Sequence, residues 1–494
     1  MVMIWLVLSV IVFIYFLQQQ LGPRNKKRLP PGPKGLPILG HLHLLGKNPH
    51  RDLYRLARKH GPIMGLRLGF VPAVVVSSPA AAELVLKTHD LIFASRPTNE
   101  AALYIAYDQR DIAFGRYGPF WRDMRKLCTL KLLSNLKISQ FQHMRRAEVG
   151  LLVTSLKRAA VSREAVDLSA RVAELNGDMN FLMVFGKKYS TMEEKGFKDV
   201  IRESMEIVGK FNLADYFPYV GVLNLQGLHG KVKRLSKIFD GILEEIIDDH
   251  MKKKQQQEAA DIVDTLMEIM ESGIAGFDFD RRHVKAVLLD MIIAGMDTSS
   301  TALEWAMSEL MKHPTVMKKL QQEVESVVGL DQMVEESHLD KLEYLDCVVK
   351  ESMRLHPVAP LLIPHESMED CELQGFFIPK RARVIMNVWA IGRDPDVWAN
   401  PDSFAPERFV GSEIDLRGRH FELIPFGSGR RGCPGLQLGL TVVKLVLAQL
   451  VHCFDWELTD GMKAGEVDMA ENFGLVTARA KPLVAVPICR LRKY

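Results

Sequence analysis

The sequence predicts a mainly α-helical protein with small β-sheets, an α+β fold built as one large domain behind a single N-terminal transmembrane helix. Three observations predict it. Apolar residues recur at helical spacing through the centre and the later part of the 494-residue chain. Short β-branched stretches near both ends are typical of strands. The first 17 residues are apolar apart from one serine, which is typical of a membrane span.

The helices and strands are predicted from this spacing. The stretch Arg67 to Ser77 predicts a hairpin with its turn near Gly69 to Pro72, and further strands are expected at Arg383 to Val388 and around Leu483 to Val486. The segments with helical spacing are Asp52 to His60, Gly118 to Leu133, Asp240 to Lys253, Arg281 to Met311, Thr315 to Val328, Leu342 to Leu355 and Leu436 to Phe454.

The N-terminal run Met1 to Leu17 spans roughly 26 Å as a helix, the short end of what crosses a bilayer. A thin membrane such as that of the endoplasmic reticulum suits it best. The alternative is a cleaved signal peptide, which needs a basic start and a small-residue cleavage site that this run lacks. Basic residues follow the run and none precedes it, which predicts a cytosolic body. Those residues are Arg24, Lys26, Lys27 and Arg28.

Three parts of the chain are therefore expected. Residues 1–20 form a membrane anchor, residues 21–40 form a basic, proline-rich hinge, and residues 41–494 form the main domain. Within the hinge, prolines at 30, 31 and 33 exclude a helix and favour a stiff extended segment.

Composition excludes some function classes. The formal net charge of +4, without a basic block carrying interleaved aromatics, argues against nucleic-acid binding. The six cysteines show no paired spacing, which argues against a disulfide framework or a zinc site.

The most informative segment is Phe426 to Gly435, FGSGRRGCPG, directly before an apolar helical pattern. A cysteine just before a helix start has its thiolate favoured by the helix dipole and by free N–H groups. Glycines let the backbone approach a flat ligand face closely. A buried cysteine by itself is more often a small hydrophobic residue than a ligand, so the surrounding loop carries the argument.

This segment matches F-x-x-G-x-R-x-C-x-G and resembles the haem-binding loop of the cytochrome P450 superfamily, most closely that of plant microsomal members. The resemblance extends from Pro30 to Cys489. It implies the cytochrome P450 fold, haem b as cofactor, and Cys433 as the axial thiolate ligand of the haem iron, which favours cleavage of the O–O bond.

A second motif lies in the helix predicted from Arg281 to Met311, as Ala294-Gly295-Met296-Asp297-Thr298-Ser299. A glycine inside a helix costs about 1 kcal/mol, and a buried carboxylate is also expensive, so both need a reason. The family resemblance implies that Gly295 leaves room beside the iron and that Thr298 and Asp297 relay protons to bound dioxygen. The alternative is a threonine that bonds back to the preceding turn.

Glu351 and Arg354 lie one helical turn apart, and such pairs are usually exposed and contribute little. The resemblance makes them the E-x-x-R motif, with Arg408 as third partner. That network is expected to brace the cysteine loop and to take no part in catalysis.

Trp121 and Arg125 share one helix face and each offers N–H donors. The resemblance implies that they hold a haem propionate together with His365 and Arg431. The loop before this helix departs from the plant pattern at Arg116, a residue expected to face solvent or a propionate, and this puts close substrate analogies in doubt.

The resemblance also places the substrate pocket, and the residues there predict a mostly apolar small molecule. An aromatic or phenolic plant metabolite is favoured, with a terpenoid as the alternative. The expected lining residues are Ile112, Phe114, Ile293, Ala294, Val358, Leu362, Phe473 and Val476.

These motifs together predict a membrane-bound monooxygenase that uses dioxygen and two electrons from NADPH. No G-x-G-x-x-G motif follows a strand, so the electrons are expected from a separate membrane-bound partner, NADPH-cytochrome P450 reductase. A basic face for that partner is expected at Arg122, Arg125, Lys126 and Arg430, whose charges are equally well explained by solvation. A haem-thiolate isomerase or dehydratase and a non-enzymatic haem-binding protein remain as alternatives.

Overall fold

The computed structural model describes residues 28–492 except 191–196, 210, 218–223, 225 and 254–260. The predicted anchor at residues 1–20 and the first part of the predicted hinge lie outside the described residues. From Arg28 onward the hinge lies against the body, where Gly65 N donates to Pro31 O at 2.8 Å and His41 Nε2 lies 2.8 Å from Pro33 O.

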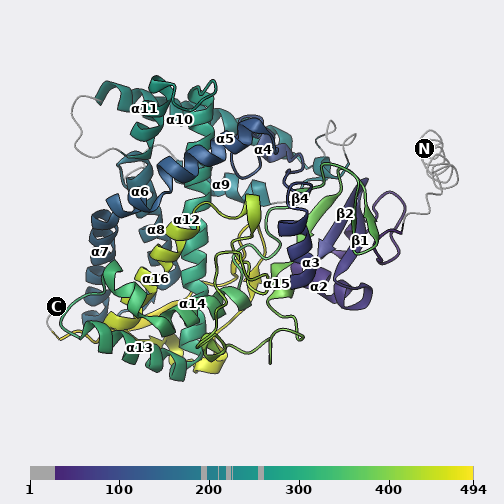
Figure 1. The fold of residues 1–494 in the computed structure, drawn as a ribbon. Helices are drawn as coiled ribbons and strands as arrows, with labels where there is room; N and C mark the ends of the chain where they lie inside the picture. Colours follow the sequence, from purple (N-terminus) through teal and green to yellow (C-terminus); the bar gives the residue numbers. More distant parts are fainter. Residues whose placement is uncertain are drawn as a thin grey trace, which may run out of the picture.

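The helices form most of the molecule, and α12 runs through its centre (Figure 1). Around it pack α8, α14 and α16. The helices are α2 (Pro49–His60), α3 (Pro79–Glu83), α4 (Glu100–Ile105), α5 (Pro119–Leu127), α6 (Asn135–Gln140), α7 (Gln142–Ser162), α8 (Leu168–Phe185), α9 (Phe197–Gly209), α10 (Leu228–Lys253), α11 (Ile262–Ser272), α12 (Arg281–Lys312), α13 (Pro314–Val328), α14 (Glu343–Leu355), α15 (Val388–Ile391) and α16 (Leu436–Cys453).

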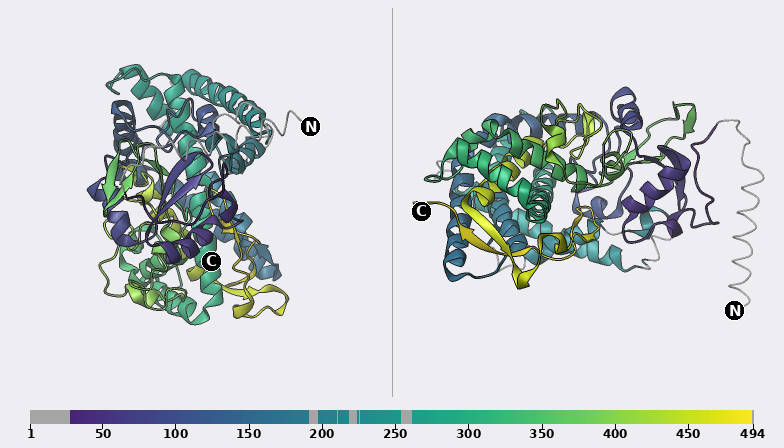
Figure 2. Two further views of the ribbon diagram at one scale, coloured as in Figure 1. Left: turned by 90° about the vertical axis from the view of Figure 1, so that its right-hand side faces the viewer. Right: turned by 90° about the horizontal axis from the view of Figure 1, so that it is seen from below.

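The strands form small sheets. One sheet has the order β1-β2-β7-β4, in which only β2 and β7 run parallel, and it lies at the opposite end of the molecule from the sheet β3-β11-β8 (Figure 2). The pairs β5-β6 and β9-β10 are separate hairpins. The strands are β1 (Ile63–Leu68), β2 (Val71–Val76), β3 (Val166–Asp167), β4 (His365–Glu366), β5 (Cys371–Leu373), β6 (Phe376–Ile378), β7 (Arg383–Met386), β8 (Phe454–Leu458), β9 (Glu471–Asn472), β10 (Ala478–Arg479) and β11 (Val484–Cys489).

The predicted fold class, mainly helical with small sheets, is confirmed, and the hairpin predicted at Arg67 to Ser77 is β1 and β2. Two predicted helix bounds differ. The helix expected to start at Asp240 starts at Leu228 as α10, and the helix expected over Gly118 to Leu133 is α5 followed by a π-helical turn, Cys128–Leu132.

Helices α7 and α8 were not predicted because their patterns are masked by the residues that they bury. In α7, Arg145 and Glu148 lie on the buried face, and the Arg145 guanidinium is neutralised by Glu336 with Nε 2.7 Å from Oε1. In α8, polar Asn176, Asp178 and Asn180 are buried along with the apolar residues. Neither helix therefore shows a clean apolar stripe.

Helix α12 begins and ends for local reasons. The Asp280 carboxylate accepts hydrogen bonds from the backbone N–H groups of Arg282 and His283, which caps its first turn. Pro314 follows its last residues and cannot extend it.

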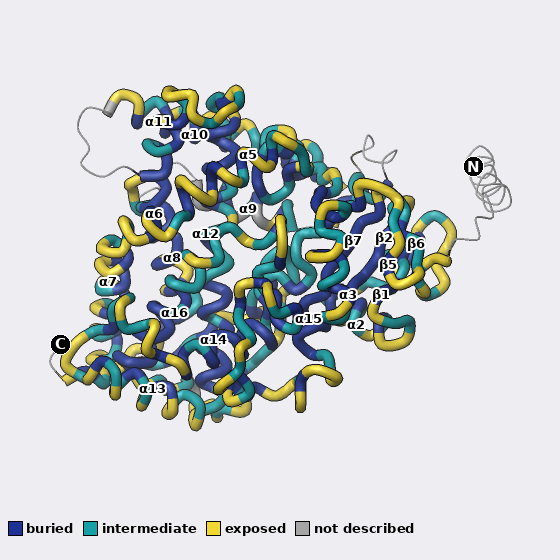
Figure 3. Tube along the Cα trace, viewed as in Figure 1, coloured by how far each residue is buried: buried dark blue, intermediate teal, exposed yellow. Residues whose placement is uncertain are grey.

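Two helices of the described region, α12 and α16, are long and apolar enough to cross a membrane, but 61% of the apolar window of each is buried inside the protein. Figure 3 shows both as largely buried tubes. They are core helices.

Helix α12 joins two apolar cores. Its first half packs into one core through residues such as Val287 and Ile292, and its second half packs into another through Leu303 and Leu310. Between them Ala294 is exposed although it stands in the middle of a core helix. Accessible surface therefore reaches the centre of the fold at the turn that carries the second motif.

Candidate functional site

The loop that carries Cys433 is held by its own backbone. Cys433 N donates to Phe426 O at 2.8 Å and Gly427 N donates to Ile424 O at 3.0 Å. Gly429 has a φ of +66° and its α-carbon lies so close to the Leu86 carbonyl oxygen that a side chain would collide with it. Glycine is therefore required at 429 both by conformation and by space.

The Cys433 side chain is accessible, and it precedes α16 by three residues. Burial among protein groups raises the pKa of the Cys433 thiol, and the Gly435 N–H and the Arg125 charge act in the opposite direction. Because a Cβ on Gly439 would lie 3.9 Å from Ser299 Oγ, α16 crosses α12 beside the turn that bears Thr298. The structure thus brings the two predicted motifs together.

Three arginines, Arg96, Arg125 and Arg431, gather beside the cysteine loop. Arg431 donates to the carbonyl oxygens of Ala94 and Gly115, each at 2.6 Å, and Arg125 donates to Gly432 O. Arg96, which the sequence reasoning missed, donates to Pro364 O at 3.1 Å and to Ala113 O at 3.1 Å.

No ion pair to a carboxylate is found for these three guanidinium groups within the described ranges. Burial, and then the repulsion from Arg431, lowers the pKa of Arg96 well below its usual value. Burial lowers the pKa of Arg431 to about 9, with Arg125 acting in the same direction and Asp111 in the other. A buried excess of positive charge is costly unless an anion is bound beside it.

The carboxyl of Asp111, whose charge acts on Arg431, is hydrogen-bonded to other groups. Its Oδ2 accepts from Phe114 N at 2.9 Å, and the carboxyl pairs with that of Asp290 on α12. Asp290 Oδ2 in turn accepts from Ile112 N at 2.6 Å. Burial raises the pKa of both carboxyls, and their proximity raises that of Asp290 further. The raised pKa values favour retention of one proton by the pair, which leaves at most one negative charge beside three guanidinium groups.

Trp121 packs against this cluster. The Arg431 guanidinium carbon lies 3.7 Å from the centroid of the Trp121 ring, and Trp121 Nε1 donates to Ile112 O at 3.0 Å. His365 is buried, and its Nδ1 lies 2.8 Å from Phe93 O. Burial lowers the pKa of His365, so its ring is neutral near pH 7. Trp121, Arg125 and Arg431 are thus brought together, with each of them and His365 bonded to a main-chain carbonyl.

Arg116 is exposed and donates to Thr98 Oγ1. Of the two positions expected for it, it faces solvent.

On α12, the structure gives a reason for Gly295 besides the expected room beside the iron. A side chain there would collide with the amide of Asn180 on α8, so a close approach of α8 already requires glycine at this position. The Thr298 hydroxyl donates to Ala294 O at 2.8 Å, the back-bonded arrangement that the sequence left open. Burial raises the pKa of Asp297, and no hydrogen bond or ion pair to its carboxylate is found among the described residues.

Glu351, Arg354 and Arg408 form a buried network. Arg354 donates to both carboxylate oxygens of Glu351, at 2.7 and 2.9 Å, and Arg408 Nε donates to Glu351 Oε1 at 2.9 Å. The remaining bonds of both arginines end on carbonyls between Gly392 and Ser403. Within the described residues, no hydrogen bond of this network ends on residues 426–435, so it ties α14 to the segment that precedes the cysteine loop.

The predicted pocket residues are distributed around these motifs. Leu362 Cδ1 would lie 3.7 Å from a Cβ on Gly427, which places the segment of Val358 and Leu362 against the cysteine loop. Thr477 N donates to Val358 O at 2.8 Å, which joins that segment to the turn of Phe473 and Val476. Phe114, Ile293 and Ala294 retain accessible surface, whereas Ile112 is 6% exposed and belongs to the core.

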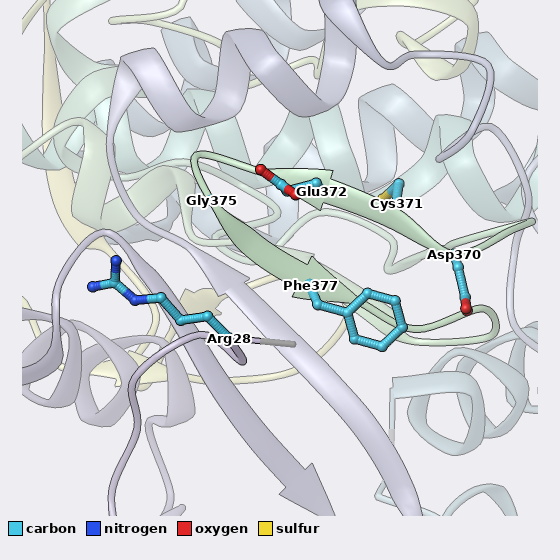
Figure 4. A pocket seen from close by; sticks show the side chains of 6 residues that line it. All are labelled: Arg28, Asp370, Cys371, Glu372, Gly375 and Phe377. Atoms are coloured by element: carbon cyan, nitrogen blue, oxygen red, sulfur yellow. The ribbon is translucent and has the colours of Figure 1, made fainter. Parts of the chain in front are cut away.

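A pocket of about 280 Å³ lies elsewhere, between Arg28 and the hairpin of β5 and β6 (Figure 4). It is lined by Arg28, Asp370, Cys371, Glu372, Gly375 and Phe377. It touches none of the predicted site residues. It is formed because Phe377 N donates to Arg28 O at 2.7 Å, which draws the two segments together.

The side chains of His250, Asp261 and Asp264 could bind a metal ion, since their ligand atoms lie within 4.8 Å of one another. These groups, however, interact with each other and with the start of α11. His250 Nε2 lies 2.9 Å from Asp261 Oδ2, and Asp261 caps α11 through Asp264 N at 2.9 Å. This arrangement is a helix cap.

Comparison with known proteins agrees with these motifs. The family model for cytochrome P450 matches residues 30–484. The chain belongs to the cytochrome P450 family. It is 52% identical over 476 residues to cytochrome P450 CYP736A12 of Panax ginseng, covering 95% of each chain. It is 44% identical over 469 residues to 4-hydroxyphenylacetaldehyde oxime monooxygenase of Sorghum bicolor, covering 93% of this chain and 88% of that one. It is 40% identical over 501 residues to 3,9-dihydroxypterocarpan 6A-monooxygenase of Glycine max, covering 98% and 97%.

The protein is therefore a cytochrome P450 monooxygenase, with haem b as cofactor, a small-molecule substrate, and electrons that come from NADPH through a redox partner. The residues present fit haem b. An accessible thiol before a helix start suits an iron ligand, and three guanidinium groups without a carboxylate partner suit the two propionates.

Proposed function

We propose that Cys433 is the axial thiolate ligand of the haem iron and that Arg96, Arg125 and Arg431 hold the propionates, with Trp121 and His365 packed against them. The observation that carries this proposal is the accessible Cys433 thiol next to three guanidinium groups that no described carboxylate pairs. The guanidinium fork suits carboxylates, and the propionates would replace main-chain carbonyls as acceptors.

Bound haem b supplies the binding and reductive activation of dioxygen. The residues of the chain then govern protons. The Asp297 carboxyl, whose pKa burial raises, would hold a proton near neutral pH more readily than an exposed carboxyl. The Thr298 oxygen, which donates to Ala294 O, keeps lone pairs to accept a hydrogen bond. We therefore assign Thr298 and Asp297 to proton delivery. Gly295 keeps the backbone beside them compact.

In the overall reaction one oxygen atom is inserted into a C–H bond of the substrate and the other leaves as water. The two electrons come from NADPH. We propose NADPH-cytochrome P450 reductase as the partner, because the chain offers a basic face near the cysteine loop. Arg122 and Lys126 are exposed on α5, and Arg430 Nε lies 2.8 Å from Asp90 Oδ2.

We propose a single-pass location in the endoplasmic reticulum membrane, with the catalytic domain in the cytosol. The apolar run Met1 to Leu17 and the basic residues after it support this orientation. Fusion of a glycosylation acceptor or a protease site to either end of the run, in microsomes, tests it. The expected result is protection of the N-terminus and exposure of the body.

The proposed substrate is an aromatic or phenolic plant metabolite. The names of the Glycine max and Sorghum bicolor relatives describe phenolic substrates, and this supports the class. The apolar character of Phe114, Ile293, Val358 and Leu362 supports it too. Binding spectra of microsomes against matched panels of phenolics and terpenoids test it. Shifts with terpenoids alone would refute the assignment.

The test of the site is Cys433→Ala. The reduced, carbon monoxide-bound protein is expected to lose its thiolate-specific absorption band, because Cys433 is the only cysteine in the loop of residues 426–435. Cys128→Ala is the matched control, since Cys128 is fully buried and burial raises its pKa. Retention of the band in Cys433→Ala removes Cys433 from the proposed role.

A further inference from the structure

We propose that Asn176 and Asn180 of α8 are positioning residues for the oxygen-activating turn of α12, and that Gly295 is glycine because Asn180 occupies the space of its side chain. The inference rests on the proposed function of Thr298 and Asp297. It adds that a neighbouring helix sets the geometry of their turn.

The two asparagines lie one helical turn apart on α8 and both donate to backbone carbonyls of α12. Asn180 Nδ2 donates to Met291 O at 3.0 Å. Asn176 Nδ2 donates to Gly295 O at 2.7 Å and also to Met296 O. Both residues are buried: Asn176 is 4% exposed and Asn180 is 6% exposed. The contacts cover the turn of α12 from Met291 to Met296.

These bonds act on the backbone of α12 itself. The Met291 and Gly295 carbonyls are four residues apart and so point along one face of the helix. A carbonyl that accepts an outside donor tilts away from the helix axis, and its bond within the helix lengthens. When the carbonyls that face α8 tilt, the backbone of this turn shifts. The shift also moves Ala294 and Thr298 on the neighbouring face of α12. Thr298 is bonded to Ala294 O at 2.8 Å, so its hydroxyl follows that carbonyl.

Gly295 is the place where the two helices come closest. An ideal Cβ there would overlap the Asn180 amide, and its next nearest neighbours are other atoms of the same side chain. Asn180 has little freedom to yield, because its Nδ2 is committed to Met291 O. A methyl group at 295 would therefore break the bond between Asn180 and Met291 or push α8 away.

The orientation of Asn180 is set by α12. Its Oδ1 is buried and has no hydrogen-bond partner among the described residues. A flipped amide would place that oxygen against the Met291 carbonyl, where two acceptors repel. A buried polar atom without a partner is costly. The observed orientation of the Asn180 amide is therefore stable because its hydrogen bond to Met291 O contributes more than the unpaired Oδ1 costs.

The test uses the haem-loaded full chain with its reductase, without substrate, and measures the decay of the dioxygen-bound reduced protein and the hydrogen peroxide formed per NADPH. Asn176→Ala and Asn180→Ala are each expected to speed the decay about three- to tenfold, the range that loss of one hydrogen bond allows. Thr298→Ala is the reference for a disrupted proton path. Asn176→Ala and Asn180→Ala should both keep the thiolate-specific band of the carbon monoxide-bound protein.

The matched control is Ser169→Ala. Ser169 also ties α8 to α12, since its hydroxyl donates to Glu304, but away from the turn of Met291 to Thr298. It should leave decay and peroxide within about twofold of the parent. An equal effect in Ser169→Ala would show that any loosening of the two helices suffices, which overturns the positioning role.

A double-mutant cycle tests Gly295. Gly295→Ala alone should lower Tm and speed the decay, whereas Gly295→Ala combined with Asn180→Ala should add little to the effect of Asn180→Ala. If Gly295→Ala lowered Tm equally in the parent and in Asn180→Ala, the glycine would be required by a contact other than Asn180. That result would overturn the inference. Tm is measured on all four proteins, so the cycle can be read even where activity is lost.

The outcomes separate this inference from the proposed function. Absence of the thiolate band in the parent protein would refute Cys433 as ligand. A normal band together with unchanged decay in both asparagine variants would refute only the role of α8.

Discussion

Two buried arginine clusters of this protein differ in how their charge is met. In the network of α14, Glu351 accepts from both Arg354 and Arg408, and the other donors end on carbonyls. Beside the cysteine loop, Arg96, Arg125 and Arg431 have carbonyl partners and no carboxylate in the described structure. The first cluster is complete within the chain and holds the fold. The second has charge to spare for a bound anion, which is what a cofactor site requires.

The largest expected effect comes from breaking the complete cluster. Glu351→Gln leaves the guanidinium of Arg354, which is 1% exposed, without its counter-charge. The free energy of unfolding should fall by about 3–5 kcal/mol, the usual cost of a buried charge that has lost its partner. Thermal or urea unfolding measures it.

The control for this change is Asp346→Asn on the same helix. The Asp346 side chain is 31% exposed, whereas that of Glu351 is fully buried, and it pairs with Lys350 at 2.8 Å and with Lys444. Because Asp346 and its partners keep some contact with water, its loss should cost less than that of Glu351, about 1–2 kcal/mol. Similar losses for Glu351→Gln and Asp346→Asn would contradict the view that burial makes the Glu351 network different.

The second prediction reduces the charge of the open cluster. Arg125→Met should weaken haem retention about tenfold to a hundredfold, the equivalent of one charge-assisted hydrogen bond. The stability of the haem-free protein should change little, since the Gly432 carbonyl is the only hydrogen-bond partner of the Arg125 side chain among the described residues. The rate of haem transfer to an acceptor protein and the Tm of the haem-free chain measure the two effects.

Arg122→Met is the matched control, because Arg122 lies on the same helix and is exposed. Its haem retention should equal that of the parent. If Arg125→Met destabilised the haem-free protein as much as it weakened haem binding, the open cluster would be structural like the other one.

The smallest expected effect concerns the Asp111–Asp290 pair that lies against the open cluster. Its folded-state pKa values are raised by burial, so the folded protein keeps a proton that the unfolded chain releases once the pH exceeds the ordinary carboxyl range. Stability from this pair is therefore lost as pH rises. Asp290→Asn keeps an oxygen for Ile112 N and carries no charge, so it should raise Tm at pH 8 by about 1–3 °C and leave Tm at pH 5 nearly unchanged.

Asp402→Asn serves as the comparison, since the Asp402 side chain is 85% exposed. It should shift Tm equally at both pH values or not at all. A gain for Asp290→Asn at pH 5 as large as at pH 8 would mean that the two carboxyls do not share a proton in the folded state.

Local motifs allowed much of the site to be predicted. The loop from Phe426 to Gly435, the helix that follows it and the 294–299 motif are contiguous stretches whose turn chemistry and spacing are visible in the chain. The Glu351 and Arg354 pair was also visible, although such pairs usually lie on the surface and the structure buries this one. Resemblance to a known family supplied the roles of these residues.

Other features had no local signal. Arg96 stands in no periodic pattern, and it reaches the site because Ala113 and Pro364 come to it from distant segments. Asn176 and Asn180 lie on a helix that was not predicted at all. The contact of Gly295 with Asn180 was also not predictable, because the sequence does not show that α8 lies against this turn.

Periodicity, turn residues and motif spacing are local properties of a chain, so the class of fold and the elements around Cys433 could be predicted from them, and the family resemblance supplied the chemistry. Which buried charges are matched, and which helix contacts the turn before Thr298, depends on tertiary packing. Both depend on groups that lie far apart in the sequence. The energy of a buried guanidinium or amide depends on the partners that surround it in the folded protein.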